Sequence, residues 1–332
     1  MARPQTLNQY NLVWASQSLN SAESMPCGGG DIGLNAWLEN GDILFYIARS
    51  GTFDESNSML KLGRVRITCE LNPFNGAVFR QELNLETGSI TISGQNGSHT
   101  KQVHIWVDVF SPVIHVEAES SEAITIEAIY ENWRFADRVL HKEESFGNSY
   151  KWALPDGSKT KKDAIGFQDN AAVFYHRNAG ETVFDVSVRQ QGMEAVKHEM
   201  FDPLKNLTFG GQFVGDSLVP TGTTAGEYWS SSHQGWRLKS ESPAKKQSCA
   251  LYLHTGQYAD QADWASALAA LIADCKKRKE LPAVKPQIGG KTAGSVAPFM
   301  SCLLYTSPSP RDLRQDLVCR LLLEKGGGGG GG

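Results

Sequence analysis

The sequence predicts an all-β fold: a large two-sheet antiparallel β-sandwich, followed by one amphipathic linker helix and an irregular tail. Residues 63–71 and 103–109 alternate apolar and polar side chains, which is the period of a strand with one buried face. Similar short runs recur along the chain, separated by turn-forming residues. A period of 3.6 residues appears only late, after residue 259. So many short strands exceed what a small closed barrel needs, and we therefore expect a sandwich.

Strands account for most of the first half of the chain. A short run at 10–14 comes first, and residues 32–37 and 42–47 then form a hairpin around Asn40-Gly41, a strong two-residue turn signal. The polar loop 50–57 follows this hairpin. Further strands are predicted at residues 63–71, 78–83, 89–93, 103–109, 113–118 and 124–130.

The second half contains a long polar insertion, from about 132 to 163, before strands resume. These later strands are predicted at residues 172–176, 183–188, 207–214 and 250–254. The late helix has one apolar face, formed by Trp264, Leu268, Leu271, Ile272 and Cys275. We therefore divide the chain into a sandwich domain at 1–258, a linker helix at 259–281 and a loop at 282–301, cut off before any further domain.

Composition excludes several classes of function. The 332 residues carry a formal net charge of -4, which argues against nucleic acid as a partner. No apolar run approaches the ~20 residues of a membrane span, and no signal peptide is visible at the start. Cys27, Cys69, Cys249 and Cys275 lie far apart, which favours buried free thiols over a zinc site or disulfides. We expect no metal and no cofactor.

A glycine-dense stretch near the start matches the dinucleotide fingerprint G-x-G-x-x-G at Gly28, Gly30 and Gly33. That fingerprint follows a strand and opens a helix, whose N-terminus holds the pyrophosphate. Here the following residues have the period of a strand. We therefore interpret Gly28, Gly30, Asp31 and Gly33 as a structural turn.

The C-terminal residues 302–332 do not resemble a natural protein. From Cys302 the sequence looks like a translated sequencing adaptor, and it ends in glycine from 326 to 332. Natural glycine-rich linkers exist, but they do not account for the preceding peptide. We therefore exclude this tail from the fold and expect it to be non-native.

The start of the chain resembles a known bacterial family. The resemblance rests on three motifs: Tyr10-Asn11-Leu12-Val13-Trp14, Met25-Pro26-x-Gly28-x-Gly30-Asp31 and Asn40-Gly41-Asp42-Ile43-Leu44. They look like those of the DUF5703-type N-terminal domain, which is more distantly similar to the N-terminal β-sandwich of family 95 glycoside hydrolases, the α-L-fucosidase group. The resemblance spans roughly Gln9 to Leu281. One departure is Gly29, where the family usually has Asn.

The resemblance implies a multidomain enzyme. In such proteins the sandwich precedes a helical linker and an (α/α)6 barrel that holds the catalytic carboxylates. The barrel would be the partner of this sandwich, and a glycan would be the substrate of the full-length enzyme. No catalytic residue can be assigned here by the family pattern, so we expect no hydrolase activity from this chain alone. A periplasmic or secreted location is the family expectation.

Aromatic and planar cationic side chains are the candidates for contacts with a sugar or with the barrel. Sugars present apolar faces and hydroxyl rims, which aromatic rings and planar donors complement. The alternative is that each Trp fills the core and each Arg pairs with a carboxylate. The candidates are Asp54, Trp133, Arg134, His233, Trp236 and Arg237.

Two functions of different class follow from these observations. In the first, the chain is the N-terminal module of a glycoside hydrolase, which docks on the missing barrel and shapes its pocket. This hypothesis predicts an exposed apolar patch near the late helix and one face of the sandwich. In the second, the chain is a free-standing carbohydrate-binding module.

Overall fold

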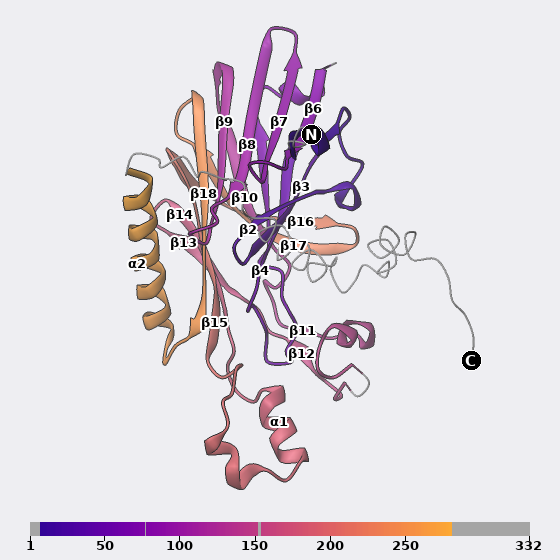
Figure 1. Ribbon diagram of the computed structural model, residues 1–332, viewed down its shortest axis with the longest axis vertical. Helices are drawn as coiled ribbons and strands as arrows, with labels where there is room; N and C mark the ends of the chain where they lie inside the picture. The colour runs from indigo at the N-terminus through magenta and orange to yellow at the C-terminus, as the bar shows by residue number, and fades with distance from the viewer. Residues whose placement is uncertain (1–6, 77, 152–153, 281–332) are drawn as a thin grey trace, which may run out of the picture.

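The computed structural model describes residues 7–280, except residue 77 and residues 152–153 (Figure 1). The described chain forms a nine-stranded and a seven-stranded antiparallel sheet packed face to face, which confirms the predicted sandwich. A separate, two-stranded sheet lies outside this sandwich. The predictions for 282–301 and 302–332 lie outside the described residues. No helix of the described part is long and apolar enough to cross a membrane.

The nine-stranded sheet contains, in spatial order, β1 (Leu12–Trp14), β6 (Val78–Asn84), β7 (Ser89–Asn96), β8 (His99–Val107), β9 (Val113–Ile124), β18 (Ala244–Gln257), β15 (Leu207–Gly215), β14 (Ala171–Arg177) and β13 (Ala164–Gln168). The seven-stranded sheet contains β16 (Leu218–Tyr228), β17 (Ser231–Ser240), β10 (Ile126–Asn132), β5 (Arg64–Cys69), β4 (Asp42–Arg49), β3 (Ile32–Glu39) and β2 (Met25–Gly29). The small sheet pairs β11 (Arg138–Val139) with β12 (Lys159–Thr160). Short 3-10 helices lie at Leu7–Tyr10, Ser21–Glu23, Pro73–Asn75, Lys142–Gly147 and Glu194–Glu199.

The core lies between the two large sheets and follows the predicted alternation. On β5, Val65 and Ile67 are buried in this core, as are Val103 and Ile105 on β8. Because neighbouring side chains of a strand point to opposite faces, the charged residues of β5 lie on the outer face of the seven-stranded sheet. That outer face carries one of the two sites described below.

The glycine-dense stretch forms the tight hairpin between β2 and β3. Gly30 occupies the turn with φ of +58°, a conformation that glycine adopts without a steric penalty. At Gly29 a Cβ would lie 3.0 Å from Cγ1 of Val109, so this position favours glycine because of close packing. Asp31 accepts a hydrogen bond from Nε of Arg49 at 2.8 Å. A strand, and no helix, follows the glycines.

The late helix, α2 (Gln261–Glu280), packs on the outer face of the nine-stranded sheet, against β18 and β15 (Figure 1). Its buried residues Trp264, Leu268 and Ile272 contact Val113 and Tyr252 of that sheet. The large apolar residues of the helix are therefore covered by its own domain, so the helix does not supply the exposed apolar patch that the docking hypothesis predicted there. Exposed apolar side chains beside it are those of Val109 and Phe110, where the Phe110 carbonyl accepts a hydrogen bond from Arg278.

The prediction of a strand at 183–188 is wrong, because Val183–Gln190 forms the helix α1. The valines favour a strand, but Thr182 and Asp185 form a capping box that satisfies backbone N–H groups at the helix start. Local capping thus overrides side-chain propensity here. With the following 3-10 helix, α1 forms a unit that projects from the lower end of the sandwich (Figure 1).

Candidate functional site

Three segments meet at the lower end of the sandwich: loop 50–61 between β4 and β5, a first insertion at 133–163 and a second at 178–206 (Figure 1). We call this region the insertion end. The carbonyl of Glu55 accepts a hydrogen bond from the amide of Val183 at 2.7 Å, and that of Ser56 accepts one from Ser149 at 3.1 Å. Loop 50–61 is therefore held between both insertions.

Asp54 organises loop 50–61 from within. Its Oδ1 accepts hydrogen bonds from the amides of Ser56 at 3.0 Å and Ser58 at 2.7 Å. Burial raises the pKa of Asp54, although the amide of Ser58 opposes this shift. Both contacts lie within its own loop, so they indicate a role in shaping that loop.

A buried ionic network lies beneath the insertion end, and we call it the Asp163 network. Asp163 accepts hydrogen bonds from Nε and Nη2 of Arg134 at 3.0 and 2.6 Å, and Nη1 of Arg134 donates to the carbonyl of Lys61 at 2.8 Å. Nδ1 of His176 lies 3.0 Å from Asp163, and its Nε2 lies 3.4 Å from Glu55. The imidazole thus bridges two carboxylates, one from loop 50–61 and one from the first insertion.

The Asp163 network is fully ionised at neutral pH. Burial by itself lowers the pKa of His176, but hydrogen bonds to Asp163 and Glu55 outweigh burial and raise it to about 9. Burial raises the pKa of both carboxyls, yet their cationic partners bring Asp163 and Glu55 to about 2. Glycoside hydrolysis needs a carboxylic acid that is protonated at working pH, and neither carboxyl meets this condition.

A second buried cluster lies on the outer face of the seven-stranded sheet, and we call it the Arg64 cluster. Cζ of Arg64 lies 4.3, 5.4 and 6.0 Å from the ring centroids of Tyr228, Trp133 and Tyr46. Nε donates to Glu131 at 2.5 Å. Arg64 is 0% exposed, yet its Nη1 and Nη2 have no hydrogen-bond partner among the described residues. Aromatic faces attract such a cation but do not replace acceptors in its plane.

Glu131 is the central acceptor of the Arg64 cluster. It also accepts a hydrogen bond from Arg66 at 2.8 Å and lies 3.5 Å from Nε2 of His233. Burial raises its pKa, but His233, Arg64 and Arg66 together lower it to about 2. Nδ1 of His233 is buried and has no partner in the described part of the chain. Three buried nitrogens of this cluster therefore remain without hydrogen-bond partners there.

The hairpin tip between β16 and β17 adjoins the Arg64 cluster. Trp229 and Ser230 form its turn with φ of 50° and 60°, where Asn and Gly are the usual residues. Trp229 is 56% exposed, and its ring stacks on Tyr228 with centroids 6.5 Å apart. An exposed indole in an unfavourable backbone conformation is a feature that clusters at functional sites.

The structure separates the residues that the sequence placed together. Trp133 and His233 lie in the Arg64 cluster, whereas Arg134 lies in the Asp163 network. Trp236 is only 6% exposed and packs in the core against Tyr130, 6.2 Å away between ring centroids. Arg237 pairs with Glu127 at 2.7 Å on the outer face of the sheet.

Four central residues were missed from the sequence: Arg64, Glu131, Asp163 and His176. A partial signal exists, since β5 and β10 carry charges at the outward positions of otherwise apolar strands. That signal marks a charged face, but it does not say which strands are neighbours.

The family described as "Domain of unknown function (DUF5703)", in its N-terminal domain, matches residues 13–285 of this chain. No curated protein sequence matches the chain. Among solved structures, similarity extends to a human-microbiome protein assigned as a kojibiose phosphorylase, with 11% sequence identity and a TM-score of 0.39. That match covers 90% of this chain and 38% of the other, so the chain spans less than half of its length.

Proposed function

Because the chain belongs to the DUF5703 N-terminal domain family, we propose that it is the N-terminal β-sandwich module of a multidomain carbohydrate-active enzyme. Its N-terminal motifs resemble those of family 95 glycoside hydrolases, which makes a glycosidase with an (α/α)6 catalytic barrel our proposal for the whole protein. The module docks on that barrel and shapes the glycan pocket. It is inactive alone.

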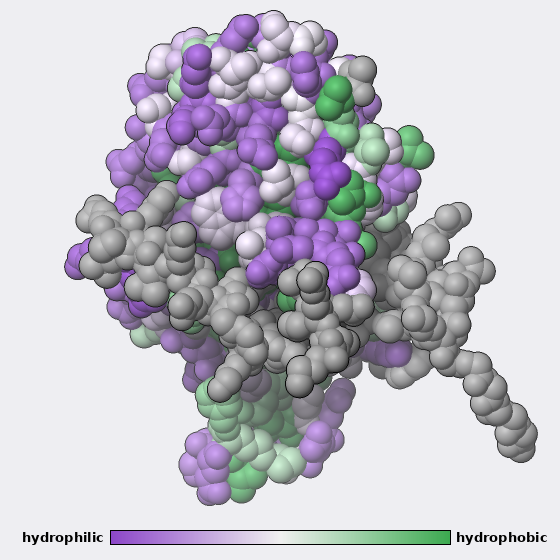
Figure 2. All heavy atoms as spheres, turned by 45° about the horizontal axis from the view of Figure 1, so that its top comes forward, coloured by the Kyte–Doolittle hydropathy of each residue, from purple (hydrophilic) through white to green (hydrophobic). Residues whose placement is uncertain are grey.

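The observation that carries the docking proposal is the apolar surface of the insertion end. The first insertion exposes Phe135, Val139 and Phe146, which are 38, 54 and 47% exposed. The second exposes Met193, Val196 and Phe201, which are 36, 40 and 76% exposed. The lower unit that holds α1 shows hydrophobic as well as hydrophilic surface (Figure 2). Apolar side chains gathered at one end of a domain favour a protein interface there.

The insertion end also suits docking because the buried Asp163 network fixes the loops that carry the apolar side chains. Interfaces gain affinity when their contact residues are held before binding. Arg134 links the first insertion to loop 50–61, and Glu55 links that loop to the second. The apolar side chains are therefore carried on a preorganised support.

The test requires the barrel encoded downstream in an uninterrupted copy of the gene. Co-expressed as a separate chain, the barrel is expected to co-purify with this module and to hydrolyse its glycoside substrate. Phe201→Asp combined with Phe146→Asp should abolish co-purification. Leu19→Asp is the matched control, because Leu19 is 79% exposed and lies outside the insertion end, and it should leave co-purification intact. Equal binding by all variants would refute the proposed docking surface.

A free-standing carbohydrate-binding module is the alternative, and the exposed indole of Trp229 favours it. An indole beside the buried donors of the Arg64 cluster offers a surface on which a sugar ring can stack. Titration with fucosylated glycans, followed by Trp fluorescence, should then show a change that Trp229→Ala removes. No change at millimolar sugar would exclude this alternative.

A further inference from the structure

A buried lysine lies inside the sandwich at one end of the two sheets. Lys101 precedes Val103 and Ile105 on the inward face of β8 and is only 3% exposed. No carboxylate pairs with it among the described residues. Its Nζ lies 3.0 Å from Sγ of Cys69 on β5, which belongs to the opposite sheet. Lysine is rarely buried without an acidic partner, so this amine–thiol pair needs an explanation.

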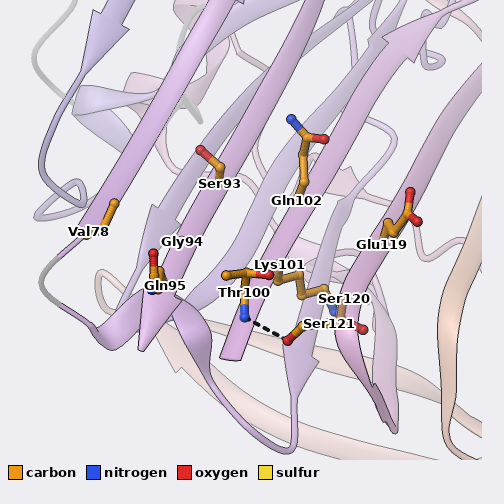
Figure 3. Close-up of a pocket in the computed structure, with 10 residues that line it drawn as sticks. All are labelled: Val78, Ser93, Gly94, Gln95, Thr100, Lys101, Gln102, Glu119, Ser120 and Ser121. Carbon is orange, nitrogen blue, oxygen red and sulfur yellow. Dashed lines mark hydrogen bonds between the residues drawn. The ribbon is translucent and has the colours of Figure 1, made fainter. Parts of the chain in front are cut away.

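Lys101, one partner of this pair, borders a hollow at the protein surface. A hollow of about 450 Å³ lies at this end of the nine-stranded sheet and is lined by polar side chains of β7, β8 and β9 (Figure 3). Lys101 lines it, beside Ser120 of β9. Cys69 itself is partly exposed. The lysine of the pair thus lies next to a polar opening wide enough for water and for molecules of similar size, and the cysteine has its own partial exposure.

We propose that Lys101 and Cys69 form a covalent sulfur–nitrogen crosslink between the two sheets when the protein meets hydrogen peroxide. In the first step the Cys69 sulfur attacks one peroxide oxygen. The O–O bond breaks, and the products are a sulfenic acid and water. In the second step the lone pair of the Lys101 amine attacks the same sulfur. The S–N bond forms, the S–O bond breaks, and the leaving hydroxide takes the amine proton as water.

Among the cysteines of the described residues, the surroundings favour Cys69 for this reaction. Burial raises the pKa of Cys27 and of Cys249 to about 12, which suppresses the thiolate that attacks peroxide. Burial also raises the pKa of Cys275. Cys69 combines partial exposure with a neighbouring amine at 3.0 Å. The trapping amine is therefore already in place when the sulfenic acid forms.

The crosslink would connect β5 and β8 and thereby join the two sheets covalently at the end where Lys101 lies. Such a bond restricts the unfolded chain, as a disulfide does, and should raise the melting temperature. Thiols cleave sulfenamides, so a reductant should restore the original protein. The two sheets would thus be joined by a reversible crosslink that forms only in the presence of peroxide.

The experiment treats the full chain with peroxide and maps the product by tandem mass spectrometry. The expected product has lost two hydrogens, about 2 Da, and joins the peptides of Cys69 and Lys101, with no tryptic cleavage after Lys101. Dithiothreitol should reverse both changes. Lys101→Met and Cys69→Ser should abolish the crosslink, whereas Cys249→Ser should retain it. Circular dichroism establishes that each variant is folded.

The melting temperature gives a second readout. Peroxide treatment should raise it in the parent chain and in Cys249→Ser, but not in Lys101→Met or Cys69→Ser. Recovery of Cys69 as an unmodified thiol, a sulfinic acid or a disulfide, with Lys101 cleaved normally, would overturn the proposal. A crosslink that persists in folded Lys101→Met would overturn it equally.

Discussion

The Asp163 network and the Arg64 cluster are built from the same residue types, yet their arginines differ in how many of their hydrogen-bond donors have a partner. Each joins an arginine to a buried acidic residue and a buried histidine. In the Asp163 network, Nε, Nη1 and Nη2 of Arg134 all donate hydrogen bonds. In the Arg64 cluster, Nε is satisfied while three aromatic rings surround the guanidinium. All three types of guanidinium nitrogen therefore have partners in the Asp163 network, whereas the Arg64 cluster retains donors without partners.

This difference indicates separate roles. A fully hydrogen-bonded ionic network holds its elements in one arrangement, and losing one partner leaves an uncompensated buried charge. The Asp163 network therefore acts as the support of the insertion end. The unused donors of the Arg64 cluster are themselves buried, and the group open to contacts from outside the described chain is the adjoining indole of Trp229. The Arg64 cluster is thus the better candidate for a contact site.

The largest effect is expected from Asp163→Asn. It leaves Arg134 and His176 buried without their shared carboxylate, which should cost about 3–5 kcal/mol of unfolding free energy. Urea denaturation measures the loss, and limited proteolysis should show faster cleavage within 133–163 and 178–206. Glu127→Gln is the matched control, because its pair with Arg237 is partly exposed and should matter by less than about 1 kcal/mol. Equal losses would contradict the supporting role.

The second prediction concerns pH. The pKa of His176 is raised to about 9 in the folded protein, against about 6.5 when unfolded. Its protonation therefore stabilises the fold fully below pH 6.5, and this contribution is lost as pH rises through 9. Asp163, Glu55 and Arg134 face the imidazole, and all three stay charged across this range.

Stability should therefore fall by about 3 kcal/mol between pH 6.5 and 9.5 in the parent chain. His176→Gln should be less stable at pH 6.5 and show a flatter profile over the same interval. Thermal unfolding at constant ionic strength measures both curves. Parallel slopes for the two proteins would show that another group causes the pH dependence.

Arg64→Met is expected to change the unfolding free energy by no more than about 1 kcal/mol. The methionine retains contact with the three rings, and Glu131 keeps Arg66 and His233 as partners. Arg134→Met is the matched variant, and it should cost about 3 kcal/mol because it opens a fully bonded network. Denaturation of the two variants compares the sites directly. A large loss for Arg64→Met alone would reverse the roles assigned to the two regions.

How far the sequence could predict these regions depends on the range of the interactions. Alternation along 63–71 correctly assigned Val65 and Ile67 to the core, and Asn40-Gly41 correctly indicated a tight hairpin. These are local properties. The ion pair between Arg64 and Glu131 joins residues 67 positions apart, and only the strand order brings β5 beside β10. A single sequence does not contain that order in readable form.

The same reasoning explains why candidate residues that are adjacent in the sequence lie at different sites. Trp133 and Arg134 are adjacent, but consecutive side chains near a strand end point to opposite sides, so each joins a different cluster. Strands β16 and β17 were missed because threonine, glycine and serine dilute their alternation. Polar, glycine-rich strands have weak periodicity, and their pairing partners define them instead.

The smallest expected effect tests whether the Arg64 side of the comparison is a contact site. Replacing Trp229-Ser230 by Asn-Gly fits both positive-φ positions and should stabilise the protein by about 0.5–1 kcal/mol. A turn that serves only to connect β16 and β17 would lose nothing by this change. If Trp229 contacts a glycan or the barrel, the more stable variant should bind more weakly, as strained functional residues do. Thermal unfolding together with glycan titration and barrel co-purification measures both quantities. A stabilised variant with undiminished binding in both assays would leave the Arg64 cluster without a contact role at this hairpin.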